Sequence, residues 1–155
     1  MGTLLIKNAD AIVTVDSRDR VLRNADILIE DGVIRAVGDG PFQADEAIDA
    51  KGCYVYPGLV NTHHHLYQTF TRNLPQVQKM ELFDWLKTLY EIWRGLDDEC
   101  VYHSSLVGMG ELVKYGCTTC MDHHYVFPRQ GSEGFLAQQF RAADALGIRF
   151  FATRG

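Results

Sequence analysis

Three consecutive histidines, His63 to His65, follow a short apolar segment that begins after Pro57-Gly58. In a β-strand, residues two positions apart point to the same side, so His63 and His65 can aim at one point while His64 turns away. Neutral imidazole is the commonest protein ligand for zinc and similar ions. The spacing therefore predicts a pair of metal ligands at a strand end. Because a catalytic zinc usually has three protein ligands, this pair needs partners from elsewhere.

A second histidine pair, His123 and His124, ends another strand-like segment that begins at Cys117. If the two strands are neighbours, one of these rings faces the same cavity, either as a third ligand or as a group that binds substrate or supports a ligand. Asp122 either orients a ligand histidine or caps the strand end. The C-x-x-C spacing of Cys117 and Cys120 does not predict a redox or zinc site, because residues three apart on a strand point to opposite faces.

Three side chains beyond the first histidines are candidates for substrate contact. Gln68 offers both a donor and an acceptor, which suits the edge of an amide-like heterocycle. Arg72 could bind a carbonyl or anionic oxygen, or it could remain a solvated surface charge. Trp85 could stack on a flat ring, although its helical spacing favours a place in the core.

The elements before these residues are predicted to be β-strands. The strongest signal is Asp31-Gly32 between residues 27–30 and 33–37, because Asp-Gly favours the tight turn of a β-hairpin. Further short strands are predicted at residues 4–6, 11–15, 47–50 and 53–56. Pro57-Gly58 then breaks the chain. We therefore predict a β-rich N-terminal domain of residues 1–57.

The hydrophobic pattern changes in residues 58–155, which we predict to be a second domain. Helices are predicted at residues 81–93, from Asp97 or Asp98 to about Tyr115, and at residues 133–146, with strands at 117–122 and 148–152. Together with the strand before the first histidines, this order is β-α-α-β-α-β, which implies a parallel sheet covered by helices. Such sheets bind ligands at the carboxyl ends of their strands, where both histidine clusters lie.

The composition is that of an ordinary soluble globular protein, with 46% apolar and 23% charged residues. A net charge of −5 without a basic run argues against nucleic acid as a partner. No window approaches the 18 apolar residues of a membrane span, so no membrane partner is expected. The four scattered cysteines and the absence of a secretory-signal pattern at the start predict a cytoplasmic protein.

The segment Pro57-Gly58-Leu59-Val60-Asn61-Thr62-His63-His64-His65-Leu66 resembles the first-strand motif of the amidohydrolase superfamily. This motif is specific when an N-terminal β-region and an Asp-Gly hairpin precede it, and residues 29–34 supply the hairpin. The resemblance implies an α/β fold, a (β/α)8 TIM barrel preceded by a small N-terminal β-sandwich domain. A whole barrel takes about 250 residues, so residues 58–155 would supply only the first roughly three βα units. The resemblance marks His63 and His65 as the first two metal ligands.

Asn61 stands where many relatives have Asp, and the form Asn-Thr-His-x-His is similar to the deaminase and chlorohydrolase branch, which implies one divalent metal, usually Zn²⁺. Within this branch, residues 63–72, 82–86 and 122–125 resemble 8-oxoguanine deaminases. The implied function is a hydrolytic deaminase that releases ammonia from a purine-like base, with 8-oxoguanine as the leading candidate, through metal-activated water. Alternatives in the branch are an s-triazine chlorohydrolase and a guanine, cytosine or nucleoside deaminase. A non-catalytic metal-binding fragment is the alternative of a different class.

The resemblance also places the family's further ligands, and the glutamate that shuttles protons, after later barrel strands. We therefore expect no catalytic acid or base within this sequence, which we expect to be part of a longer enzyme. Gln68, Arg72, Trp85 and His123 are the residues expected to contact a small-molecule substrate. A homo-oligomer is expected only because relatives form them.

Overall fold

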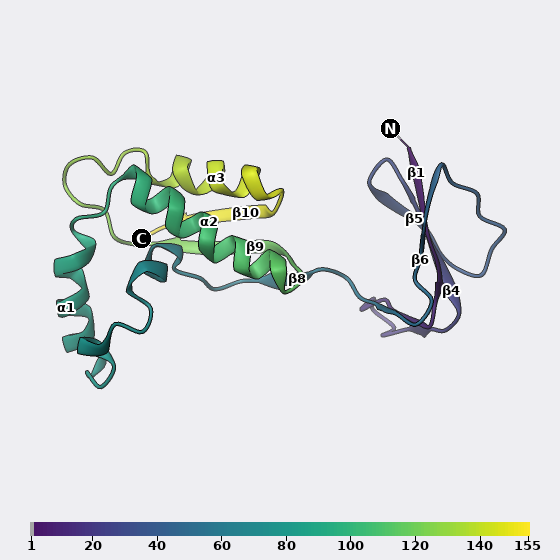
Figure 1. The fold of residues 1–155 in the computed structure, drawn as a ribbon, viewed down its shortest axis with the longest axis horizontal. Coiled ribbons are helices and arrows are strands. Elements are labelled where there is room, and N and C mark those ends of the chain that lie inside the picture. The colour runs from purple at the N-terminus through teal and green to yellow at the C-terminus, as the bar shows by residue number, and fades with distance from the viewer. Residues whose placement is uncertain (1) are drawn as a thin grey trace. The chain divides into compact units, whose positions relative to one another are not determined.

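The computed structural model describes residues 2–155 (Figure 1). Their contacts gather into two compact units that divide between Pro57 and Gly58. Within the described part of the chain, no helix is both long and apolar enough to cross a membrane.

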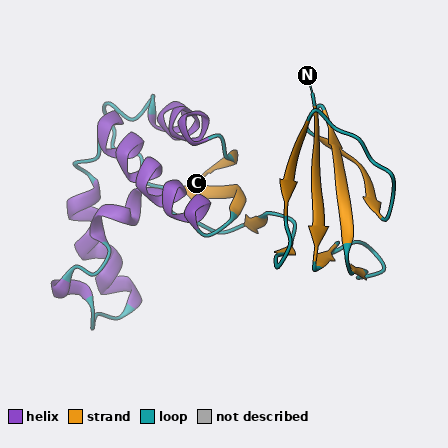
Figure 2. Ribbon diagram, turned by 45° about the vertical axis from the view of Figure 1, so that its right-hand side comes forward, coloured by secondary structure: helices purple, strands orange, loops and turns teal. Residues whose placement is uncertain are grey.

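The first unit is built from two small β-sheets (Figure 2). The larger sheet has the order β5 (Val33–Gly38), β4 (Ala25–Glu30), β1 (Thr3–Ala9), β6 (Glu46–Asp49). The smaller sheet has the order β3 (Val21–Leu22), β2 (Ala11–Val13), β7 (Tyr54–Val55). Small and branched apolar side chains form the core of this unit, namely Ala9, Ile12, Ala25, Ile27 and Ala50.

The turn between β4 and β5 confirms the predicted hairpin. Asp31 and Gly32 have φ angles of 49° and 76°, so both central residues adopt the left-handed conformation that a type I′ turn requires. Glu30 and Val33 pair directly across the turn. The strand predicted at residues 11–15 is shorter than expected and ends at Val13, because Val15 has a φ of 50°, which is incompatible with a strand.

The second unit alternates strands and helices in the predicted order. Its sheet is parallel, with the order β10 (Arg149–Arg154), β9 (Cys117–His124), β8 (Leu59–Asn61). The helices are α1 (Leu82–Trp93), α2 (Asp98–Lys114) and α3 (Phe135–Leu146). Cys120 of β9 packs with Met109 of α2 and Ala142 of α3, so both helices cover the same face of the sheet.

The helix ends follow the predicted caps. Asp97, rather than Asp98, is the N-cap of α2, and its Oδ1 accepts a hydrogen bond from the Cys100 backbone N–H at 2.7 Å. Gly116 and Gly147 have φ angles of 83° and 68°, which permit the left-handed conformation after α2 and α3. Helix α3 begins at Phe135, two residues later than predicted.

Two short 3₁₀ segments between β8 and α1 were not predicted: η1 (Leu66–Thr71) and η2 (Pro75–Val77). Segment η1 starts directly after the three histidines and buries Leu66 and Tyr67 completely. Leu66 joins the core between the sheet and its helices, and Tyr67 joins a second cluster of aromatic and aliphatic side chains with Trp93 of α1. Segment η1 therefore connects residues 62–65, which we call the histidine loop, to both cores.

Gly108 of α2 allows η1 to approach the helix closely, which leads to a prediction. A Cβ at this position would lie 2.8 Å from Leu66 Cδ2 and 3.2 Å from Thr69 Oγ1. Because Leu66 is fully buried and cannot move aside, we expect Gly108→Ala to lower the free energy of unfolding by about 1–3 kcal/mol.

Gly110 in the same helix is the matched control. A Cβ there would meet only Leu146 Cδ2, at 3.9 Å, which is an ordinary contact. Gly110→Ala should therefore stabilise the protein by about 0.5–1 kcal/mol through helix propensity. Denaturant unfolding of both variants measures the difference, and equal effects of the two substitutions would contradict the close-approach interpretation.

Candidate metal and substrate site

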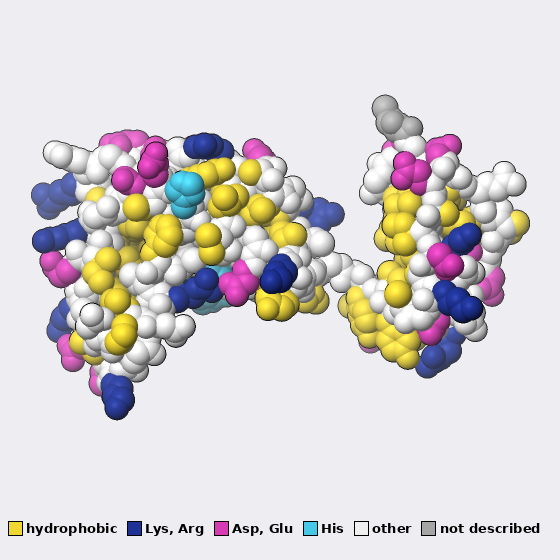
Figure 3. All heavy atoms as spheres, in the orientation of Figure 1, with side chains coloured by type: hydrophobic (Ala, Val, Ile, Leu, Met, Phe, Trp, Pro, Cys, Tyr) yellow, Lys and Arg dark blue, Asp and Glu magenta, His cyan; other side chains and the backbone are white. Residues whose placement is uncertain are grey.

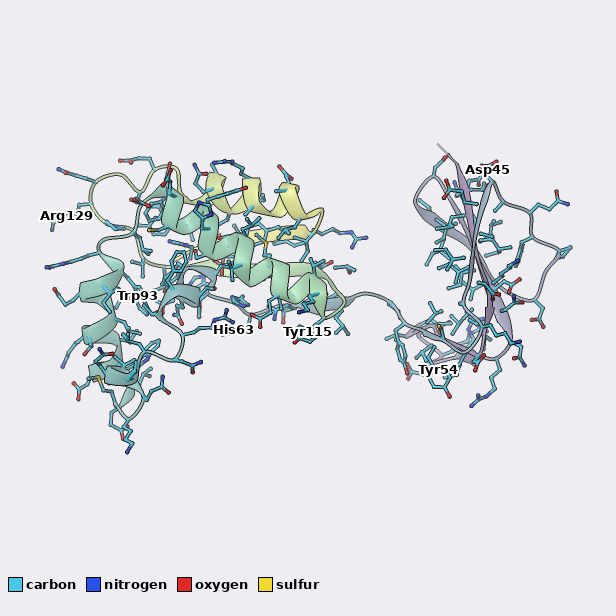
Figure 4. The ribbon with its side chains drawn as sticks, in the orientation of Figure 1. Asp45, Tyr54, His63, Trp93, Tyr115 and Arg129 are labelled. Atoms are coloured by element: carbon cyan, nitrogen blue, oxygen red, sulfur yellow. The ribbon has the colours of Figure 1, made fainter. Side chains whose placement is uncertain are left out.

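The first three histidines lie just beyond β8, whose pairing with β9 ends at Asn61. The backbone nevertheless continues alongside β9, because the His123 N–H donates to His64 O at 2.9 Å. The Nε2 atoms of His63 and His65 lie 3.3 Å apart. His63 is labelled in Figure 4. The structure thus brings together the two rings that the spacing predicts to converge.

The hydrogen bonding of His65 leaves its Nε2 suited to bind a metal. Its Nδ1 lies 2.8 Å from the backbone oxygen of His123. A carbonyl only accepts, so Nδ1 carries the proton and the neutral ring keeps a lone pair on Nε2. Two nitrogens at 2.0–2.1 Å from one tetrahedral zinc lie about 3.3–3.4 Å apart, which matches the observed separation. In the described part of the chain, no group of three or more His, Cys, Asp or Glu completes a metal site.

The pocket beside these rings has a volume of about 260 Å³ and an open mouth. It is lined by His63, His64, His65, Gln68, Thr69 and Arg72. His64 is half-buried, and burial lowers its pKa below the ordinary value. Two of the predicted substrate contacts, Gln68 and Arg72, therefore share a pocket with the predicted ligands.

Arg72 is engaged by α2. Its guanidinium lies 2.7 Å from Glu111 Oε2, and this hydrogen bond lowers the pKa of the Glu111 carboxyl. Both side chains are about half exposed, so the ion pair contributes little to stability. The pair instead fixes the direction of the guanidinium at the pocket wall.

Gln68 is hydrogen-bonded to Tyr125, which does not itself line this pocket. Its Nε2 donates to the Tyr125 hydroxyl at 2.9 Å, and the Tyr125 ring lies edge-on to the His65 ring with centroids 5.0 Å apart. Trp85 does not line the pocket but packs in the aromatic cluster of Trp93, with ring centroids 5.6 Å apart. Trp85 therefore occupies the core position that its helical spacing favours.

The second histidine pair divides into one exposed and one buried ring. His124 is fully buried on the helix-covered face, and its Nε2 donates to Val126 O at 2.9 Å. His123 is exposed on the opposite face, with its ring centroid 6.1 Å from that of His65. Of the two rings, His123 is the exposed one near His65, although it does not line the pocket that holds Gln68 and Arg72.

His124 leads to a prediction about acid stability. Burial lowers its pKa to about 4 from an ordinary value of 6.5. Its Nδ1 is buried without a partner, so a second proton would create an unpaired buried charge. The unfolded chain takes up this proton near pH 6.5 and the folded chain only near pH 4. The shifted pKa therefore leaves stability unchanged above pH 6.5, and the free energy of unfolding falls by about 3 kcal/mol as the pH drops to 4.

The measurement compares unfolding at pH 7 and pH 4.5 for the wild type and His124→Gln. Glutamine keeps a donor for Val126 O but does not titrate, so the variant should lose less stability on acidification. His103→Gln, at an exposed position of α2, is the matched control and should keep the wild-type pH dependence. Parallel pH profiles for the wild type and His124→Gln would contradict the prediction.

A buried carboxylate holds the histidine loop in place. Asp122 is fully buried; its Oδ1 accepts from the Leu66 backbone N–H at 2.6 Å and its Oδ2 from Gln139 Nε2 at 2.7 Å. Burial raises the pKa of Asp122, although these two hydrogen bonds act in the opposite direction. The carboxylate thus links β9 and α3 to the residue that follows His65. The sequence left open whether Asp122 orients a ligand histidine or caps the strand end, whereas its carboxylate binds the Leu66 backbone and the Gln139 side chain.

Several residues of the site have no sequence signal of their own. Gln139, Tyr125 and Thr153 each contact a predicted site residue or Asp122. The alternation along β9 gives one indirect signal, because Cys120, Asp122 and His124 share the covered face. A carboxylate at such a position needs buried donors, but the pattern does not say which residues supply them.

The chain matches the protein-family model described as the amidohydrolase family over residues 54–155. It is 39% identical to hydroxydechloroatrazine ethylaminohydrolase of Pseudomonas sp. (strain ADP), over 100% of this chain and 35% of the relative. It is 40% identical to 8-oxoguanine deaminase of Pseudomonas aeruginosa, over 100% of this chain and 34% of the relative.

Solved structures show the same similarity. Atrazine chlorohydrolase from Arthrobacter aurescens TC1, solved in complex with zinc, has a TM-score of 0.92 and 31% identity, covering 97% of this chain and 35% of that chain. This chain therefore spans about a third of the length of the relatives that it matches.

Proposed function

The chain belongs to the amidohydrolase family, and from this premise we propose that it is part of a metal-dependent hydrolytic deaminase of a purine-like base, with 8-oxoguanine as substrate. The convergence of His63 and His65, with Nε2 atoms 3.3 Å apart, is the observation that carries the proposal. The 40% identity to an 8-oxoguanine deaminase over the whole chain supports the choice of base.

We propose that the metal is a divalent ion, with zinc as the leading candidate, and that His63 and His65 hold it through Nε2. When bound, such an ion supplies Lewis-acid activation of a water molecule. His65 is prepared for this role because its Nδ1 is already committed to the backbone oxygen of His123. By resemblance to the family, the remaining ligands and the proton-shuttling carboxylate belong to later strands.

The chain's own residues would bind and orient the base. Gln68 donates to the Tyr125 hydroxyl, and the His123 ring lies 5.9 Å from the Tyr125 ring. Arg72 is held at the pocket wall by Glu111. We assign Gln68, Arg72 and His123 to the polar edge of the ring. Trp85 belongs to the apolar cluster that also packs against Tyr125, so we assign it to the wall behind that residue.

We further propose that the first unit is an N-terminal β-sandwich domain and that residues 58–155 are the first part of a (β/α)8 barrel. One apolar core shared by strands of both small sheets supports the sandwich. The barrel is supported by the uncovered edge of β8, where Leu59 and Val60 remain 60% and 61% exposed. Figure 3 shows apolar side chains at the surface of the second unit. An exposed apolar edge strand is prone to aggregate, so further strands of the full-length protein would cover it.

Product analysis of the full-length protein tests the function. We expect ammonia release from 8-oxoguanine with a kcat/KM at least about tenfold above that for guanine or cytosine, because a missing hydrogen bond to a substrate costs at least this much. The 39% identity to an ethylaminohydrolase supports one second candidate, for which ethylamine would be released from an N-ethylamino-s-triazine. Chloride release from a chlorotriazine would indicate a chlorohydrolase. No release of any amine from aromatic substrates would contradict the proposed class.

A further inference from the structure

We propose that Thr153 fixes His123 as a hydrogen-bond acceptor, so that the site selects a heterocycle that donates a ring N–H to His123 Nε2. This inference rests on the proposed function and narrows its substrate class. It concerns a residue of β10 for which the sequence pattern predicts no role.

The hydrogen bonds of Thr153 determine which nitrogen of His123 carries the proton. Thr153 Oγ1 lies 3.2 Å from the backbone oxygen of Asp122 and 2.7 Å from His123 Nδ1. The backbone oxygen can only accept, so we assign the single hydroxyl proton to it, although this contact is the longer of the two. The hydroxyl then accepts from His123, which places the ring proton on Nδ1. In the neutral ring, Nε2 is left with a lone pair and no proton.

The register of the sheet brings these two side chains together. Thr153 pairs with His123 between the parallel strands β10 and β9, so both side chains project from the same face. This is the face opposite to the one that α2 and α3 cover. Accordingly, His123 is exposed, whereas its neighbours Asp122 and His124 on the covered face are fully buried.

The space beside Nε2 is kept open by Gly155. A Cβ at Gly155 would lie 2.9 Å from His123 Nε2, and the Gly155 backbone is fixed by a hydrogen bond to His124 O at 2.9 Å. Any larger side chain would therefore crowd the lone pair. The His123 ring is also close to the metal-ligand candidate His65, with centroids 6.1 Å apart, a separation that one heterocycle can bridge.

An acceptor at this position discriminates between related bases. A purine oxidised at carbon 8 is a lactam whose N7 carries a proton, whereas N7 of guanine is a bare lone pair. The lone pair of His123 Nε2 would attract the first and repel the second. A site that hydrogen-bonds a substrate N–H rejects an analogue without it, because the site's polar group is left unpaired.

The test uses the full-length, metal-loaded protein with Thr153→Val, which removes the hydroxyl and keeps the branched shape, and Thr153→Ser, which keeps the hydroxyl. The ¹⁵N spectrum of the His123 ring without substrate should show Nε2 unprotonated in the wild type and in Thr153→Ser. In Thr153→Val, about nine-tenths of the population should shift to the other tautomer, because apparent affinity falls in proportion to the competent fraction. The KM for 8-oxoguanine should rise about tenfold in Thr153→Val, with kcat and metal content within about twofold of wild type.

Two outcomes would overturn the proposal. The first is a protonated Nε2 in the wild-type ring, and the second is a Thr153→Ser variant that behaves like Thr153→Val. 7-Methyl-8-oxoguanine lacks the N7 proton, so the wild type should bind it at least about tenfold more weakly than 8-oxoguanine. Thr153→Val should bind the two bases with about equal affinity. If the protein deaminates no base, the proposed function fails, while the ¹⁵N spectrum still decides the tautomer.

Discussion

The full-length protein with His65→Ala is expected to lose its metal and at least about 10³-fold in kcat/KM. A metal centre contributes several kcal/mol to transition-state stabilisation, and each 1.36 kcal/mol corresponds to a factor of ten in rate. His65 is central because its Nε2 meets His63 Nε2 at 3.3 Å while its Nδ1 is held by the backbone of β9. A water molecule in the space left by the ring cannot restore this fixed direction.

Metal content by mass spectrometry and steady-state kinetics measure this effect. His103→Ala is the matched control, because this histidine is exposed on α2 and does not line the pocket beside His65. The control should keep its metal and its activity. If His65→Ala retained stoichiometric metal at wild-type affinity, the assignment of the ligand pair would be wrong.

The fold of the second unit follows largely from local signals in the sequence. The N-cap Asp97 and the left-handed Gly116 and Gly147 set the ends of α2 and α3, and these rules act within a few residues. In the first unit, the Asp31-Gly32 turn follows from an equally local signal. The parallel order β10-β9-β8 could be predicted because helices separate the strands along the chain.

Features that depend on packing between distant segments were not predictable in the same way. The choice between His123 and His124 depends on which face of β9 the helices cover, and the sequence leaves both possibilities open. Segment η1 carries no helical period, because its conformation depends on burial of Leu66 and Tyr67 in two different cores. The convergence of His63 and His65 was predictable because it needs only the strand period of two.

The candidate site illustrates the same distinction. Its ligand candidates follow from residue type and spacing, but the groups that orient them come from elements far along the chain. His65 is oriented by a backbone oxygen 58 residues away, and the loop after it by the side chain of Asp122. The contact to His65 leaves no pattern in a single sequence, because every residue type carries the same backbone oxygen.

Asp122→Ala, which removes the carboxylate that holds the histidine loop, is the second substitution for which we expect a large effect. It would leave the Leu66 N–H and the Gln139 amide buried without partners, at a cost of about 1–3 kcal/mol each. We therefore expect the free energy of unfolding to fall by about 2–5 kcal/mol. Because the loop that carries His65 loses its anchor, metal affinity of the folded protein should fall about 10–100-fold.

Two further variants separate anchoring from folding. Asp122→Asn should recover most of the loss, because its oxygen still accepts from Leu66. Its amide can donate to Gln139 Oε1 once the Gln139 amide turns over, since Nε2 faces Asp122 and Oε1 is buried without a partner in the wild type. Cys120→Ala truncates a fully buried residue on the same face of β9 and should lower stability without changing metal affinity. Metal titration below the unfolding temperature of each variant measures the affinity. Wild-type affinity in folded Asp122→Ala would show that Asp122 stabilises the fold without positioning His65.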